Sequence, residues 1–81
     1  MFYVYVLQSK NFPDRFYTGV TIDLKKRLAE HNSGASIHTN KFKPWILRTY
    51  LGFNNQKRAE DFERYLKTSS GRAFMTRVRT H

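Results

Sequence analysis

The chain has 81 residues, of which 40% are hydrophobic and 16% aromatic, and its fifteen Lys and Arg against six Asp and Glu give a formal net charge of +9. This length and composition predict one small packed domain over residues 1–81 and argue against intrinsic disorder. The absence of cysteine excludes disulfides and thiolate metal sites.

The net positive charge indicates what kind of partner the protein binds. A net charge of this size repels itself, and a polyanion such as nucleic acid is the commonest partner that offsets the repulsion. An anionic membrane surface and a solvated basic surface without a binding role are the alternatives, although the basic residues are not confined to one amphipathic helix. No apolar run approaches the roughly 20 residues that span a bilayer, and the first residues lack a basic leader, so we expect a cytoplasmic protein without a membrane segment.

The first half of the chain predicts a β-hairpin followed by a helix. Residues 2–7 are almost all β-branched or aromatic, which is typical of a strand buried on both faces. Turn-forming residues then precede a second strand at 16–20, which should pair antiparallel with the first. Asp23 and Gly34 are suited to the N-cap and the stop of a helix over about 24–33.

The second half predicts a third strand and two further helices. Residues 35–43 are polar and basic without a clear period, so we expect a loop there. A third strand follows over 45–53. The apolar residues that its period of two places on one face are Trp45, Leu47, Leu51 and Phe53. A helix over about 56–68 and a shorter one over about 72–78 complete the chain.

These elements resemble the GIY-YIG nuclease superfamily, in particular its small single-domain bacterial members. The segments that carry the resemblance are, in chain order, Tyr3-Val4-Tyr5, Tyr17-Thr18-Gly19, the helical residues Asp23 to Asn32, Lys43-Pro44-Trp45, and Phe62 to Lys67. Tyr3 stands where the motif's name has Gly, and Thr18 where it has Ile. The resemblance implies an α/β fold of the α+β type, with a central three-stranded antiparallel sheet flanked by about three helices.

The same resemblance implies a divalent-metal-dependent endonuclease that hydrolyses DNA phosphodiester bonds in repair or recombination, with one Mg²⁺ or Mn²⁺ ion. Such hydrolysis needs an activated water, neutralisation of charge on the phosphoryl oxygens, and help for the departing oxygen. Two other hypotheses stay open. One is a non-catalytic nucleic-acid-binding module, for DNA or RNA, and the other is a subunit of a repair assembly whose protein partner supplies specificity.

Glu63 is the residue that we expect to hold the metal ion. It falls on the inward stripe of the helix over 56–68, together with Ala59, Phe62 and Leu66, where an unpaired carboxylate is costly. A hard cation can be held by one carboxylate together with water and substrate oxygens. The alternative is an ion pair with Lys67, one helical turn further on.

The catalytic candidates are Tyr5, Tyr17, Arg27 and His31, which we expect to converge with Glu63 on one face of the sheet. Arg27 has a planar guanidinium suited to phosphate oxygens, and His31 can accept a proton from water or from Tyr17. Tyr17 would orient or deprotonate the attacking water, with Tyr5 assisting, once a cation or hydrogen-bond partner favours the phenolate. The alternatives are a solvated basic helix face, a surface histidine, and core tyrosines with satisfied hydroxyls.

Gly19 and several basic residues complete the predicted site. Because Gly19 lacks a side chain, we expect it to permit close approach of backbone or substrate. The basic residues expected to contact nucleic-acid phosphates are Lys25, Lys26, Lys41, Lys43 and Arg72. Such contacts carry little sequence information and weaken as salt rises.

Overall fold

The computed structural model describes residues 1–68 and Gly71. Within them, β1 (Phe2–Ser9), β2 (Phe16–Thr21) and β3 (Trp45–Phe53) form one antiparallel sheet with the strand order β2-β1-β3. The predicted three-stranded antiparallel sheet and its hairpin are therefore confirmed. β1 is the central strand, and β2 and β3 are the two edges.

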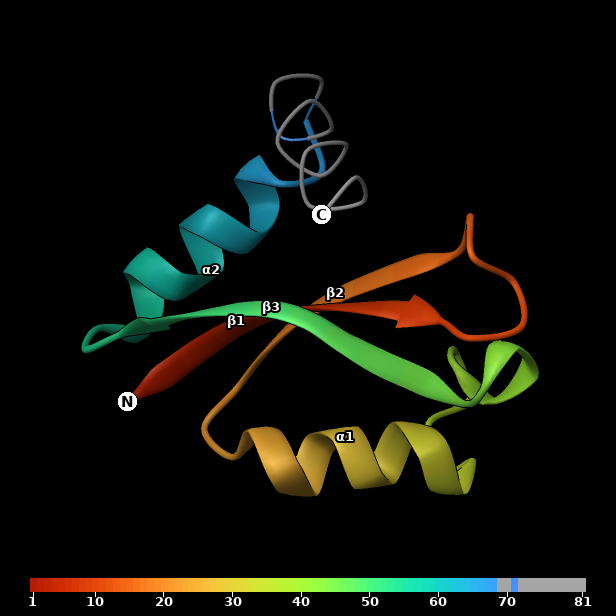
Figure 1. The fold of residues 1–81 in the computed structure, drawn as a ribbon. Coiled ribbons are helices and arrows are strands. Elements are labelled where there is room, and N and C mark those ends of the chain that lie inside the picture. Colours follow the sequence, from red (N-terminus) through yellow and green to blue (C-terminus); the bar gives the residue numbers. More distant parts are fainter. Residues whose placement is uncertain (69–70, 72–81) are drawn as a thin grey trace.

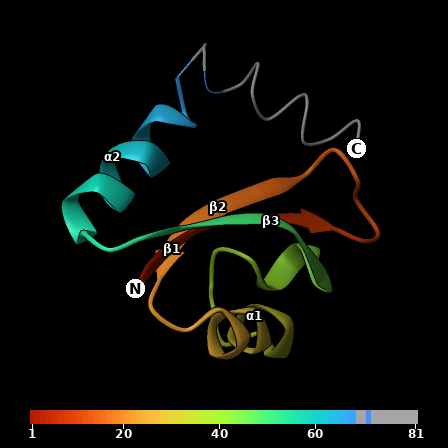
Figure 2. The ribbon, with the colours of Figure 1, turned by 60° about the vertical axis from the view of Figure 1, so that its left-hand side comes forward.

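One helix covers each face of the sheet, as Figures 1 and 2 show. They are α1 (Leu24–Ser33), which follows the hairpin, and α2 (Gln56–Tyr65), which follows β3. A short 3₁₀ turn, η1 (Asn40–Phe42), lies within the segment that was expected to be a loop. The expected helix over 72–78 lies outside the described residues. No helix in the described part of the chain is long and apolar enough to cross a membrane.

Local capping signals explain where the helices begin and end. The Asp23 side chain accepts a hydrogen bond from the backbone N–H of Lys26, as its N-cap position predicts. Gly34 ends α1 in the left-handed region, with φ of 85°, which a residue without a β-carbon adopts readily. Asn55 caps α2 by accepting from the N–H of Arg58.

β1 supplies side chains to two separate cores because its residues alternate between the faces of the sheet. The core under α2 contains Val4, Val6, Ala59 and Leu66. The core against α1 contains Tyr5, Leu7 and Trp45, with Leu24 and Leu28 of α1 packed on it. The four residues from Val4 to Leu7 are each at most 2% exposed, which confirms a central strand buried on both sides.

β3 has an extra residue that changes which face its side chains occupy. Val6 and Leu7 are neighbours on β1, but their partners on β3 are Thr49 and Leu47. Arg48 is the additional residue between these pairs, which is the arrangement of a β-bulge. A shift of one residue moves every following side chain to the opposite face.

The expectation that the four apolar residues of β3 share one face is therefore wrong. Trp45 and Leu47, before the bulge, pack in the core against α1. Phe53, after the bulge, packs in the core under α2, and Leu51 is 44% exposed. The period of two holds on each side of Arg48 but not across it.

Hydrogen bonds to Trp45 fix α1 against β3. The Asn32 side-chain amide donates to the Trp45 carbonyl at 3.1 Å, and its oxygen accepts from the Trp45 backbone N–H. The Trp45 indole N–H donates to the carbonyl of Thr39 at 2.8 Å. The end of α1, the segment before η1 and the start of β3 are thereby tied together, which sets the position of the side chains on α1.

Candidate active site

Three of the predicted catalytic side chains meet on the face of the sheet that α1 covers. Tyr5 lies on β1, and Arg27 and His31 lie one turn apart on α1. The Tyr5 hydroxyl lies 3.0 Å from His31 Nε2, and Arg27 Nε donates to the same Tyr5 oxygen at 3.4 Å. Tyr5 is 2% and His31 0% exposed. The fold thus encloses a phenol, an imidazole and part of a guanidinium in one cluster.

Tyr17 joins this cluster from β2. It pairs with Leu7 of β1, and its ring centroid lies 4.9 Å from that of His31 and 6.4 Å from that of Tyr5. Tyr17 is half-buried, and within residues 1–68 and Gly71 its hydroxyl has no hydrogen-bond partner. That hydroxyl is available to a bound water or a substrate oxygen.

Gly19 makes room for Tyr5. The two residues are direct partners across the β1–β2 ladder. A β-carbon on Gly19 would lie 2.5 Å from the Tyr5 hydroxyl oxygen and 2.7 Å from its ring carbon Cζ, closer than such contacts ordinarily occur. The close approach at Gly19 in this structure is therefore that of the Tyr5 ring, which crosses the glycine on the edge strand.

Thr39 holds the second nitrogen of His31, and sequence reasoning missed it. Its hydroxyl oxygen lies 2.7 Å from His31 Nδ1, and the residue is 0% exposed. Thr39 lies in the polar stretch before η1, which has no apolar period and no motif that would single it out. Only the fold, which brings positions 31 and 39 together, identifies it.

Burial and Arg27 set the protonation of the cluster. Burial raises the pKa of Tyr5, and the Arg27 guanidinium opposes this only in part. Burial, and then the charge of Arg27, lowers the pKa of His31, although Glu30 acts in the opposite direction. The hydrogen bond with Tyr5 raises the pKa of Arg27, which keeps its charge. At neutral pH the free protein therefore holds a phenol, a neutral imidazole and a guanidinium.

Glu63 lies on α2 and so belongs to the other layer of the fold. The expected convergence of all five side chains on one face is wrong, because α1 and α2 cover opposite faces (Figure 1). The Glu63 side chain is 17% exposed, and its carboxylate pairs with Lys67 Nζ at 2.7 Å, which is the alternative that the sequence left open. α2 also packs on the edge strand β2, and the sheet lies between Glu63 and Arg27.

The donor set around Glu63 fits only a cation that keeps most of its water. Within the described residues there is no group of three or more His, Cys, Asp or Glu side chains that could hold a metal ion. Mg²⁺ commonly binds through one or two carboxylates together with waters and substrate phosphates. Glu63 can contribute one such ligand once Lys67 moves aside, and substrate oxygens would complete the set.

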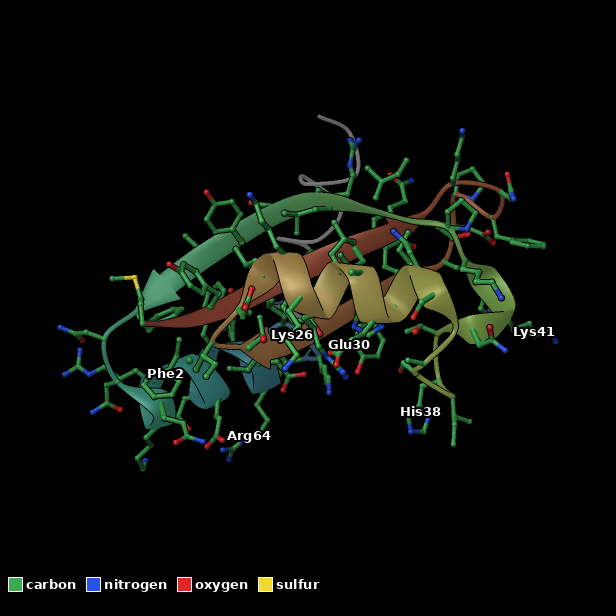
Figure 3. The ribbon with its side chains drawn as sticks, turned by 90° about the horizontal axis from the view of Figure 1, so that it is seen from below. Phe2, Lys26, Glu30, His38, Lys41 and Arg64 are labelled. Atoms are coloured by element: carbon green, nitrogen blue, oxygen red, sulfur yellow. The ribbon has the colours of Figure 1, made fainter. Side chains whose placement is uncertain are left out.

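The predicted phosphate contacts are solvent-exposed where the structure describes them. Lys25 and Lys26 lie on α1, and Lys41 and Lys43 lie in and just after η1. In Figure 3 Lys26 lies on α1 and Lys41 beyond the other end of that helix. Arg72 lies outside the described residues. The exposed lysines thus extend along the same layer as Arg27.

A family model described as the GIY-YIG catalytic domain matches residues 1–77. The chain belongs to the GIY-YIG family. The resemblance inferred from the two tyrosine motifs, the helical residues Asp23 to Asn32 and the segment Phe62 to Lys67 is therefore confirmed. Membership of the GIY-YIG family implies nuclease-type activity, and the domain suggests DNA as the substrate.

Relatives of this GIY-YIG chain include proteins of similar size. A UPF0213 protein encoded in the ldhD 5′ region of Pediococcus acidilactici is 39% identical over 72 residues, which cover 85% of this chain and 71% of that protein. UPF0213 protein SpyM50708 of Streptococcus pyogenes serotype M5 is 36% identical over 72 residues, 88% of this chain and 76% of that protein. The solution NMR structure of UPF0213 protein BH0048 from Bacillus halodurans matches with a TM-score of 0.55 and 27% identity, over 96% of this chain and 85% of that one. The shared fold confirms the predicted fold class.

Proposed function

We propose that this GIY-YIG protein is a divalent-metal-dependent endonuclease that hydrolyses phosphodiester bonds in DNA, in repair or recombination. The observation that carries the proposal is the hydrogen-bonded cluster of Tyr5, Arg27 and His31, in which Tyr5 is 22 positions from Arg27 and 26 from His31 in the sequence. A buried polar cluster is expensive unless its groups are satisfied. The Arg27 side chain of this cluster is 35% exposed, so a phosphate can reach the guanidinium while Tyr5 and His31 stay buried.

Arg27 is proposed to bind the phosphoryl group. Its side chain is 35% exposed, so the guanidinium is anchored by Tyr5 at Nε while the rest remains accessible. One of its terminal nitrogens, Nη1, pairs with Glu30 at 3.2 Å, and a phosphate can replace this contact. Charge-assisted bonds from arginine to phosphate oxygens are among the stronger hydrogen bonds in proteins. Lys25 and Lys26 on the same helix, with Lys41, Lys43 and Arg72, are proposed to contact neighbouring phosphates.

Tyr17 is proposed to orient the attacking water, because its hydroxyl has no other partner among the described residues. Tyr5 assists from the neighbouring strand. His31 is fully buried and bonded at both nitrogens, so it acts on Tyr5 rather than on water directly. In the reaction, the water oxygen bonds to phosphorus and the water gives up one proton. The bond from phosphorus to the departing oxygen breaks, and that oxygen takes up one proton, so the net change is the addition of one water.

Glu63 is proposed to hold one Mg²⁺ or Mn²⁺ ion in place of its pairing with Lys67. When bound, the ion supplies neutralisation of charge on the phosphoryl oxygens and a more acidic water. Because Glu63 and Arg27 lie on opposite faces, one DNA substrate would have to pass around an edge of the sheet to contact both residues.

Cleavage of end-labelled duplex, single-stranded and branched DNA tests the proposal, in Mg²⁺, in Mn²⁺ and in EDTA. We expect cleavage by the full chain with either metal ion and none in EDTA. Arg27→Ala and Glu63→Gln should lose cleavage while retaining DNA binding. Arg64→Ala is the matched control, because Arg64 is an exposed arginine on α2 that pairs with Asp61 at 3.4 Å. Full activity of Glu63→Gln would remove Glu63 from the mechanism.

The ion pair between Glu63 and Lys67 favours a second candidate, a non-catalytic nucleic-acid-binding module, because the carboxylate is already neutralised without a metal. This module, for DNA or RNA, would bind in EDTA with affinity that falls steeply with salt, and would cleave no substrate. A subunit of a repair assembly would instead cleave only after a protein partner is added. Capture from native extract, followed by the cleavage assay on the captured complex, separates these two cases.

A further inference from the structure

A line of three buried polar side chains runs from the candidate site to η1. Tyr5 Oη and Thr39 Oγ1 lie 3.0 and 2.7 Å from the two ring nitrogens of His31, Nε2 and Nδ1. The Thr39 backbone is fixed as well, because its carbonyl accepts from the Trp45 indole at 2.8 Å. Among residues 1–68 and Gly71, each ring nitrogen of His31 therefore has one hydrogen-bond partner.

Tyr5, His31 and Thr39 together carry more protons than the two hydrogen bonds between them use. A neutral imidazole carries one proton, and the hydroxyls of Tyr5 and Thr39 carry one each. The two contacts to His31 use two of these three protons, so one hydroxyl proton is left over. If His31 carries its proton on Nδ1, it donates to Thr39 and accepts from Tyr5, and the Thr39 hydroxyl proton is left without an acceptor. If His31 carries its proton on Nε2, it donates to Tyr5 and accepts from Thr39, and the Tyr5 hydroxyl proton is the one left over.

The surroundings of the two hydroxyls decide between these arrangements. Thr39 is 0% exposed, and its hydroxyl has no second hydrogen-bond partner among the described residues. A buried donor without an acceptor is costly, so the spare proton is disfavoured there. Tyr5 lies on the central strand and is itself 2% exposed, but its oxygen contacts Arg27, whose side chain is 35% exposed and can be reached by a substrate.

The charged neighbours of His31 agree with this arrangement. From α1, Arg27 can only donate, so it uses a lone pair of the Tyr5 oxygen and not the Tyr5 proton. Glu30 is engaged by Arg27 at 3.2 Å, and Tyr17 contributes a ring contact from β2. With Arg27 and His31 both donating to the Tyr5 oxygen, its proton is directed away from both.

We propose that Thr39 is a positioning residue that donates to Nδ1 of His31 and so holds the His31 proton on Nε2, which leaves Tyr5 free to donate its own proton in a hydrogen bond to a substrate oxygen. The role of Tyr5 in this statement rests on the proposed function. His31 is then a donor that orients a phenol. It is not the base that the sequence suggested.

Histidine tautomers can be observed directly. Long-range ¹H–¹⁵N correlation spectra of the full chain, labelled with ¹⁵N-histidine, distinguish a ring protonated at Nε2 from one protonated at Nδ1. We expect His31 to show the Nε2–H pattern near pH 7.5, and Thr39→Ser to preserve it. Thr39→Val should reduce the population of that tautomer. The exposed His38 provides an internal reference. An Nδ1–H pattern in the unaltered protein would overturn the assignment.

Kinetics then test the consequence. Tyr5→Phe should lower kcat by about 100-fold, the scale of losing one donor to a transition state. Thr39→Val should lower kcat by on the order of tenfold with KM unchanged, and Thr39→Ser should restore it. Added to Tyr5→Phe, Thr39→Val should cause no further loss, since it acts through Tyr5. Thr49→Val is the matched control, because this threonine pairs with Val6 on the other face.

The outcomes separate this inference from the proposed function. Equal losses from Thr39→Val in the presence and absence of the Tyr5 hydroxyl would show a structural effect alone and overturn the positioning role. A protein that cleaves no DNA under any condition, yet shows the Nε2–H tautomer, would overturn the proposed function and leave the assignment of Thr39 standing.

Discussion

Replacing Gly19 with alanine tests whether the space beside this glycine sets the geometry of the site. The added β-carbon would lie 2.5 Å from the Tyr5 hydroxyl oxygen, whereas ordinary van der Waals contact begins at 3.4 Å. The hydroxyl must therefore move by about 0.9 Å, the difference between these distances. A misplacement of about 1 Å in a reacting group can cost about 100-fold in rate. We expect a loss of cleavage of that size.

The assay measures the rate of cleavage at saturating Mn²⁺ together with the free energy of unfolding in urea. Gly52→Ala is the matched control, because its β-carbon would also lie 2.5 Å from a neighbour. That neighbour is the sulfur of Met1, which is at the end of a flexible side chain in a residue 67% exposed, and it can move without cost to the site. Gly52→Ala should therefore keep its rate.

Overpacking at Gly19 should also lower the free energy of unfolding, by about 1–3 kcal/mol. The reasoning is refuted if Gly19→Ala is folded and cleaves as fast as the unaltered protein. It is also refuted if Gly52→Ala loses as much activity as Gly19→Ala, because crowding of any strand glycine would then explain both.

Three further predictions concern the surroundings of the site. Asn32→Ala should lower the free energy of unfolding by about 2 kcal/mol in urea titrations, because it leaves two backbone groups of Trp45 without partners. Lys67→Met should tighten Mn²⁺ binding in calorimetry by removing the ammonium that pairs with Glu63. Burial, and then the charge of Arg27, lowers the pKa of His31 in the folded protein, so His31 binds protons more readily in the unfolded chain. The free energy of unfolding that this neutral histidine contributes is therefore complete above about pH 6.5 and is lost as the pH falls. His31→Gln should flatten this part of the pH dependence of urea unfolding.

Matched variants control each of these results. Asn54→Ala changes an exposed asparagine and should leave stability unaltered. Lys57→Met removes another i,i+4 ion pair of α2, with Asp61 at 3.5 Å, and should not affect Mn²⁺ binding. His38→Gln should retain the loss of stability towards low pH. Equal effects in a variant and its control would contradict the corresponding prediction.

Much of the fold follows from signals that are local in the sequence. Asp23 and Gly34 act as caps through contacts within a few residues, so their roles can be inferred from the local sequence. The bulge at Arg48 cannot be inferred in this way, because it exists only in the pairing of β3 with β1. The failure to predict the faces of β3 has this single non-local cause.

The residues of the site likewise differ in whether the local sequence identifies them. Tyr5, Tyr17, Arg27 and His31 could be chosen from motif positions, and the fold brings their side chains together. Thr39 could not be chosen, since its contact with His31 depends on how the segment before η1 folds back. The inward position of Glu63 was predictable from helical spacing. The layer it occupies was not, because helical spacing does not specify which face of a sheet a helix covers.

The central position of β1 has a consequence for how the molecule loses its structure. Adjacent residues of that strand belong to different cores, so neither helix can detach without exposing side chains that the remaining layer needs. Such sharing favours all-or-none melting, in which the amides of β1 exchange with solvent only through global opening. Heat inactivation and loss of secondary structure should accordingly coincide in temperature.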